Sequence, residues 1–190
     1  MFLSFEPFYG WVTWYDPDTD DNSPFYGGGP HRNEEGPKIY NFPAHPDWDD
    51  FGSESLLTKI LFADYSRGYV VIEFLGYWND LLLNDFKMLA ENVLTWLIDG
   101  GIRHFIFLTE NVFNIWLGSD DYYEALQEEI EDGWICILKG RKSVLAEIDR
   151  YGIDRFLYRS SALDNLQWRK LKPWDLFDVV NESISRLLKA

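Results

Sequence analysis

Beyond residue 55 the hydrophobic positions fall into two alternating patterns. Short runs that are apolar throughout predict β-strands, and segments with an apolar residue every three or four positions predict amphipathic helices. The predicted strands are 56–65, 69–75, 102–109, 134–138 and 153–158, and the predicted helices are 80–99, 120–132, 141–151 and 173–189. The element order is therefore β-β-α-β-α-β-α-β-α.

The connections between these elements predict how the strands run. Ser66-Arg67-Gly68 is a short turn between the first two strands, so these two strands form an antiparallel hairpin. Each later strand follows a helix, which is typical of right-handed crossovers in a parallel sheet. The centre of strand 102–109 is apolar on both sides, as in a sheet that is covered on two faces. The sequence thus predicts an α/β domain with a mostly parallel five-stranded sheet and helices on both faces.

The same spacing predicts which side of each helix is buried. The predicted inward positions are Leu82, Phe86, Leu89, Val93 and Leu97 in the first helix, Tyr122, Leu126 and Ile130 in the second, Val144 or Leu145, Ile148 and Tyr151 in the third, and Leu176 or Phe177, Val180, Ile184 and Leu187 in the fourth.

The first 54 residues differ from the rest of the chain. They hold seven of the eight prolines, an Asp-rich stretch at 16–21 and Gly27-Gly28-Gly29, which leaves little room for regular elements. They also hold many aromatic residues, in which disordered tails are poor. We therefore expect an irregular extension (1–54) that packs through its rings on a single α/β domain (55–190). A free tail is the alternative.

Charge is spread unevenly along the chain. The 32 acidic and 17 basic residues give a net charge of −15. Residues 1–55 hold 11 acids and 2 bases (−9), 56–138 hold 14 and 4 (−10), and 139–190 hold 7 and 11 (+4). A chain with this negative charge repels phosphate backbones and anionic lipids. We therefore expect neither a nucleic acid nor a membrane as its partner. The basic C-terminal part complements the acidic remainder, either within one chain or in a second copy.

Cysteine content and hydropathy bear on the compartment. The single cysteine, Cys136, lies in the apolar run 134–138, and we expect a buried, inert thiol there. The N-terminus lacks the basic segment and apolar run of a signal peptide. No stretch reaches the roughly 20 apolar residues that span a bilayer. The sequence therefore predicts a cytoplasmic protein.

Two acidic features resemble metal sites in part. Asp16, Asp18 and Asp20 alternate as in a calcium loop, but such a loop needs Gly at position 6 and Glu at position 12, where this chain has Asp21 and Gly27. His45 precedes three carboxylates, in a segment without a second histidine at ligand spacing. We therefore expect a solvated turn and a surface histidine, and no bound metal.

Polar residues follow the predicted parallel strands, where open sheets bind ligands. Asp80, Glu110, Lys139 and Arg141 are the candidate catalytic or ligand-binding set at that edge. The structural alternative is that such residues cap helices or are solvated. The chain has no nucleophile motif and no standard Gly-rich phosphate loop, so no cofactor is expected.

The segment 111–118 follows the central strand and is expected to form a loop. It carries large apolar residues before the next helix. Either these residues fold back into the core, or they expose a patch that a partner covers. Phe113, Ile115 and Trp116 are the candidate partner-binding residues.

The element order of residues 56–190 resembles the STAS domain, the fold of anti-sigma-factor antagonists. The phosphorylatable serine that these regulators carry after the central strand is missing at Glu110-Asn111-Val112-Phe113-Asn114, and the nearest hydroxyls are Thr109 and Ser119. The resemblance implies a regulatory domain but no phosphorylation at that loop.

Two functional hypotheses follow. The first is a non-catalytic interaction or regulatory domain that binds another protein or a second copy of itself. The second is a small-molecule-binding protein or enzyme whose polar site lies at the carboxyl ends of the parallel strands. The absence of a catalytic motif favours the first.

Overall fold

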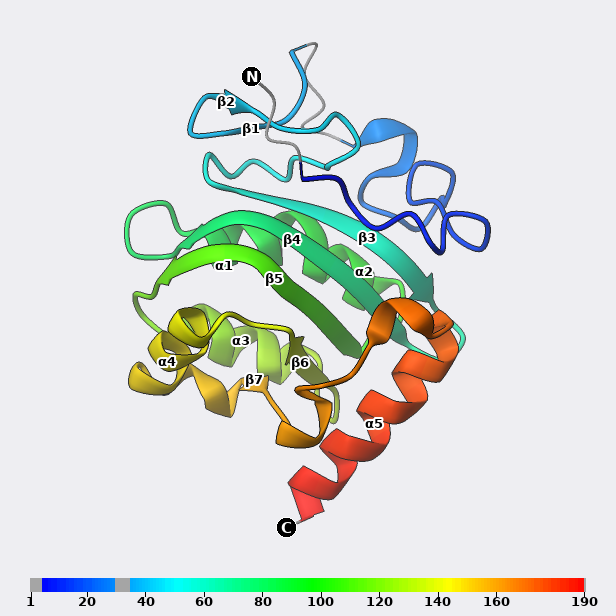
Figure 1. Cartoon of the computed structure of the whole chain (residues 1–190), viewed down its shortest axis with the longest axis vertical. Coiled ribbons are helices and arrows are strands. Elements are labelled where there is room, and N and C mark those ends of the chain that lie inside the picture. The colour runs from blue at the N-terminus through cyan, green and yellow to red at the C-terminus, as the bar shows by residue number, and fades with distance from the viewer. Residues whose placement is uncertain (1–4, 30–34, 190) are drawn as a thin grey trace.

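The computed structural model describes residues 5–29 and 35–189, and Figure 1 shows the arrangement of the chain. The strands are β1 (Lys38–Ile39), β2 (Phe42–Pro43), β3 (Leu56–Asp64), β4 (Tyr69–Asn79), β5 (His104–Trp116), β6 (Trp134–Leu138) and β7 (Leu157–Tyr158). The helices are α1 (Asp85–Leu89), α2 (Thr95–Asp99), α3 (Asp121–Glu129), α4 (Lys142–Arg150) and α5 (Pro173–Lys189). A π-helical stretch, Ala90–Leu94, joins α1 to α2.

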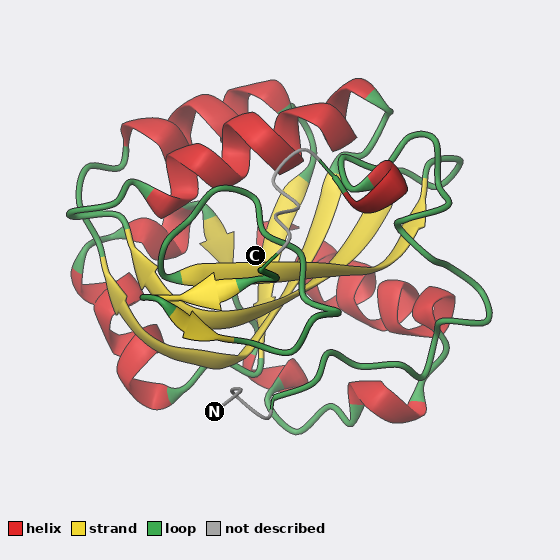
Figure 2. Cartoon of the chain, turned by 90° about the horizontal axis from the view of Figure 1, so that it is seen from above, coloured by secondary structure: helices red, strands yellow, loops and turns green. Residues whose placement is uncertain are grey.

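Five strands form one sheet in the order β3-β4-β5-β6-β7. β3 and β4 are antiparallel, and the other neighbours are parallel. Helices α1 to α4 cover one face of the sheet and α5 covers the other, so the sheet lies between two layers (Figure 2). The predicted fold class, with its N-terminal hairpin and mostly parallel sheet, is confirmed.

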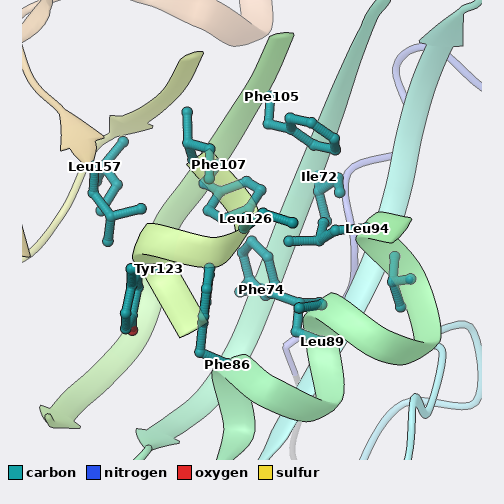
Figure 3. Close-up of a cluster of buried hydrophobic side chains, with 14 of the residues drawn as sticks. Ile72, Phe74, Phe86, Leu89, Leu94, Phe105, Phe107, Tyr123, Leu126 and Leu157 are labelled. Carbon is teal, nitrogen blue, oxygen red and sulfur yellow. The ribbon is translucent and has the colours of Figure 1, made fainter. Parts of the chain in front are cut away.

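The larger core fills the face under α1 to α4. Figure 3 shows Ile72 and Phe74 of β4 and Phe105 and Phe107 of β5 packed against Phe86 and other helix residues. The ring of Phe86 stacks on that of Tyr123 with centroids 3.7 Å apart, which joins α1 to α3. Each such buried side chain contributes roughly 1.5–3 kcal/mol through the hydrophobic effect.

The opposite face carries a second core under α5. The ring of Tyr69 stacks on that of Phe177, and Trp11 and Trp168 complete the layer from outside the regular elements. Cys136 is fully buried there, and burial raises the pKa of its thiol to about 12. The thiol is therefore a structural apolar group, as the sequence predicts.

The central strand is longer than predicted. β5 continues to Trp116, so the expected loop at 111–118 is wrong over most of its length. Strand β4 also continues, to Asn79, and the two strands stay paired through two register shifts. Gly76 lies at one of these shifts with a φ of +125°, and a Cβ there would lie 2.3 Å from the carbonyl oxygen of Ser55, next to β3.

Several predicted element details are also wrong. The first helix begins at Asp85 rather than residue 80, which leaves Leu82 exposed. Residues 153–155 form a 3₁₀ turn, and only Leu157–Tyr158 pair as a strand. Tyr122, Tyr151 and Leu187 are also exposed, because Tyr123 takes the inner position of α3 and the other two lie at helix ends that extend past the core.

The described residues before β3 lie against the domain at several points. The Trp11 indole donates to the carbonyl of Leu171, and the amide of Phe8 donates to the Glu73 carboxylate at 2.8 Å. Ile39 and Trp48 form a small third cluster with Leu75 and a neighbour on β3. These contacts place the segment over the β3 side of the sheet (Figure 1).

Candidate functional site

The carboxyl ends of β4 to β7 lie along one edge of the sheet, where the four candidate site residues were expected to meet. Asp80 instead binds inward. Its carboxylate accepts hydrogen bonds from the Trp78 indole, the Phe86 amide and the Tyr123 hydroxyl. Burial raises the pKa of Asp80 to about 6, although these hydrogen bonds lower it. Asp80 thus holds the start of α1 against α3.

The other three residues lie nearer to one another. The Arg141 guanidinium donates to the Glu110 carbonyl at 3.2 Å, and the Glu110 carboxylate forms a two-pronged ion pair with Arg169. The Lys139 ammonium donates to the carbonyl of Asp164 at 2.8 Å. The structure therefore brings Glu110 and Arg141 together and leaves Asp80 apart from them, so the four do not form one constellation.

Lys139 and Arg141 lie between β6 and α4, and Lys142 is the first residue of α4; we call these three the basic loop. None of the three forms an ion pair within residues 5–29 and 35–189. Lys139 has a φ of +61°, a left-handed conformation that is uncommon for a residue with a side chain. A pocket of about 320 Å³ opens between this loop and the end of β7.

The predicted partner-binding residues divide between the core and the surface, because side chains alternate along β5. Ile115 is 2% exposed and belongs to the core, whereas Trp116 is 39% exposed. Phe113 is half-buried between the rings of Phe5 and Tyr77. Of the three, only Trp116 presents a large apolar area to solvent.

Trp116 belongs to a wider apolar surface, which we define as Tyr40, Leu81, Leu82 and Trp116. Leu81 and Leu82 are 62% and 77% exposed. The amides of Asp80 and Leu81 both donate to the Trp116 carbonyl, so the loop after β4 is fixed beside the end of β5. Asn79 ties the remaining parts together, since its side chain accepts from the Leu82 amide and donates to the Tyr40 hydroxyl.

Acidic side chains adjoin this apolar surface. Gly118 lies against the backbone of Asp80 and Leu81, and α3 begins three residues later. Six exposed carboxylates on α3 and the turn after it form no ion pair with any described residue: Asp121, Glu124, Glu128, Glu129, Glu131 and Asp132. We call these six the acidic helix. The edge of the sheet thus offers an apolar surface beside a negative one.

Glu73 is a buried carboxyl that the sequence reasoning missed. It lies in the middle of β4 with 1% exposure, between the core under α5 and the small cluster of Ile39 and Trp48. Its carboxylate accepts from the Phe8 amide and lies 3.8 Å from Arg169. Burial raises its pKa to about 7. A single charged residue within an apolar strand is the sequence signal that marks it.

Asp85 is a second buried carboxyl, which the sequence pattern does not indicate. It accepts hydrogen bonds of 2.7 Å each from the hydroxyls of Ser53 and Ser55 and from the Asn79 amide. Burial raises its pKa, while the three donors act in the opposite direction. The carboxylate therefore joins the chain before β3, the end of β4 and the start of α1.

Two of the candidate metal carboxylates bind groups of the protein, whereas Oδ1 of Asp18 is buried without a hydrogen-bond partner among the described residues. Asp20 accepts from the hydroxyls of Tyr15 and Tyr65, and Asp16 accepts from the amide of Asp18. His45 lies 3.9 Å from the carboxylates of Glu6 and Asp47. Within the described part of the chain, no three carboxylate, imidazole or thiol groups are placed to hold a metal ion.

Comparisons with known proteins give little beyond the fold. No protein family matches the chain, and no curated protein matches its sequence. A solved structure of the anti-sigma factor antagonist SpoIIAA in its unphosphorylated form aligns with a TM-score of 0.47 and 14% identity. The alignment covers 66% of this chain and 96% of that one. A likeness this weak says nothing about what the chain binds.

Within the described residues, no helix has the length and apolarity needed to cross a bilayer.

Proposed function

We propose that this protein is a non-catalytic interaction domain whose apolar surface docks a segment of another protein. The observation that carries the proposal is the exposure of Leu81, Leu82 and Trp116 together at one edge of the sheet. Large side chains grouped on a surface in this way are typical of partner-binding sites. The hydrogen bonds that fix the loop after β4 hold the group in place before any partner arrives.

The charge beside the apolar surface indicates the chemistry of the partner. The acidic helix has one lysine near it, Lys87, which lies over the Tyr122 ring and beside Glu91. A segment that carries apolar side chains flanked by lysine or arginine would match both surfaces. A second copy of the chain matches less well, because two molecules of charge −15 repel each other.

The proposal predicts that substitutions Leu81→Ser and Leu82→Ser together abolish capture of the partner. Immobilised wild-type protein is expected to retain a discrete protein from an extract of its own cells, and to release it as the salt concentration rises. The double variant is expected to retain none of it. Both side chains are mostly exposed, so the melting temperature should stay within about 2 °C of the wild type.

The matched control is Leu187→Ser with Leu188→Ser, which removes two leucines of similar exposure at the end of α5. This control is expected to capture the partner as well as the wild type does. Equal capture by both double variants, or no discrete protein on the wild type, contradicts the proposal. A concentration-dependent dimer in light scattering that only Leu81→Ser/Leu82→Ser disperses would assign the surface to self-association instead.

A further inference from the structure

The pocket beside the basic loop is lined partly by apolar and partly by polar side chains. The apolar part comes from the end of β6, from α4 and from the 3₁₀ turn after β7, and the polar part comes from charged and hydroxyl side chains. The lining residues are Ile137, Leu138, Lys139, Gly140, Lys142, Leu145, Arg159, Ser160, Leu163 and Asp164. Its volume of about 320 Å³ lies within the range of small-molecule sites.

Three cations line this pocket in a chain that is strongly acidic overall. Lys142 forms no ion pair with a described residue, and Lys139 donates to a carbonyl, which leaves its charge uncompensated. Arg159 shares its guanidinium with Asp149 on α4. The lining thus holds three cations against one carboxylate, that of Asp164, and this excess of positive charge indicates an anionic ligand.

The backbone at the start of α4 adds neutral donors. Arg141 has an extended conformation and no side chain caps the helix. The amides of residues 140–144 donate to no acceptor within the described residues, since the first bond of the helix is from Leu145 to the Arg141 carbonyl. Gly140 and Lys142 line the pocket, so the start of α4 lies at the same wall as the ammonium groups. This combination binds phosphate groups in many proteins.

The remaining polar groups suit a ligand that is more than a bare anion. Asp164 lines the pocket and would repel a free phosphate, but its carboxylate can accept a hydrogen bond from a hydroxyl. The Ser160 hydroxyl is 2.7 Å from that of Ser183 and can also bond a neutral polar group. The apolar wall and the volume leave room for a small organic part.

We infer that this pocket binds a phosphate monoester that also carries hydroxyl groups. The phosphate lies against Lys139, Lys142 and the first amides of α4, and a ligand hydroxyl bonds to Asp164. The site is separate from the apolar surface, which lies beyond the ends of β4 and β5. The inference about this pocket therefore does not depend on the proposed interaction function.

The test is titration of the ¹⁵N-labelled protein with glycerol 3-phosphate, inorganic phosphate and glycerol, followed by amide chemical shifts. Glycerol 3-phosphate is expected to shift the amides of Gly140, Lys142 and Ser143 and to bind more tightly than inorganic phosphate. Glycerol alone is expected to shift none of them. The substitution Lys142→Gln should raise the Kd for glycerol 3-phosphate about tenfold, because it removes one charge-assisted hydrogen bond.

Lys170→Gln is the matched control, since Lys170 is an exposed lysine outside the pocket. It should leave the Kd unchanged, and the spectra themselves report whether each variant is folded. The inference is overturned if millimolar glycerol 3-phosphate shifts none of the loop amides. It is also overturned if the two lysine variants weaken binding equally, which would mean that only the overall charge attracts the anion.

Discussion

Replacing Asp85 by alanine is expected to lower the free energy of unfolding by about 3–5 kcal/mol. The substitution removes the acceptor of three buried hydrogen bonds, from Ser53, Ser55 and the Asn79 amide. Each donor left without a partner costs about 1–3 kcal/mol. Urea denaturation at a fixed pH measures the change. Since whole domains are stable by only about 5–15 kcal/mol, this loss brings the protein close to unfolding.

Two further variants test the reason for this loss. Asp85→Asn keeps an oxygen acceptor and should cost less than Asp85→Ala. Asp121→Ala is the matched control, because Asp121 is also the first residue of a helix but is exposed. It should cost less than about 1 kcal/mol, the usual size of a helix-dipole effect. A loss below about 1 kcal/mol for Asp85→Ala would show that the three bonds do not anchor the N-terminal segment.

Stability is expected to fall as the pH rises from about 5 to 8, the reverse of ordinary acid denaturation. Burial raises the pKa of Glu73 from 4.5 to about 7, and raises those of Asp49 and Asp80 from 3.8 to about 6. The folded state therefore binds more protons than the unfolded state over this range, and stability decreases with pH. The three carboxyls contribute fully to stability when the pH is below their pKa values in the unfolded state. This contribution is lost as the pH rises through their pKa values in the folded state. For Glu73 alone the loss is about 3 kcal/mol.

The variant Glu73→Gln isolates the largest part of this dependence. Glutamine keeps an oxygen for the Phe8 amide and has no charge to desolvate. The difference in unfolding free energy between pH 5 and pH 8 should shrink by about 3 kcal/mol, and the remaining slope belongs to Asp49 and Asp80. Glu124→Gln, at an exposed position of α3, should keep the wild-type slope. A wild type that is more stable at pH 8 than at pH 5 would refute this account.

The hydrophobic pattern predicts an element correctly where the buried positions of that element follow a regular pattern along its whole length. Strand β6 and helix α5 were predicted within a residue, because the one is apolar throughout and the other begins at Pro173 with a regular apolar spacing. The second half of β5 was missed because Glu110, Asn111 and Asn114 are typical of loops. Their strand conformation depends on pairing with β4, which is a contact between segments distant in sequence.

The polar edge of the sheet could be predicted, but the arrangement of its side chains could not. The rule for parallel sheets indicates the loop with Lys139 and Arg141 correctly as a polar edge. It does not say which way a side chain turns after its strand ends, so Asp80 was grouped with residues that it does not approach. The exposure of Leu81 and Leu82 could not be predicted, because their spacing fits a helix that begins only at Asp85.

The unequal lengths of β5 and β6 leave part of a strand without a neighbour. β6 pairs with β5 only as far as Leu108, and no described strand pairs with the outer edge of β5 from Thr109 to Trp116. Open edges of this kind recruit strands from other molecules and start aggregation. Here Arg141 donates to the Glu110 carbonyl, and its guanidinium covers the Phe113 ring. Arg141 therefore covers part of this open edge and hinders the addition of another strand to the sheet.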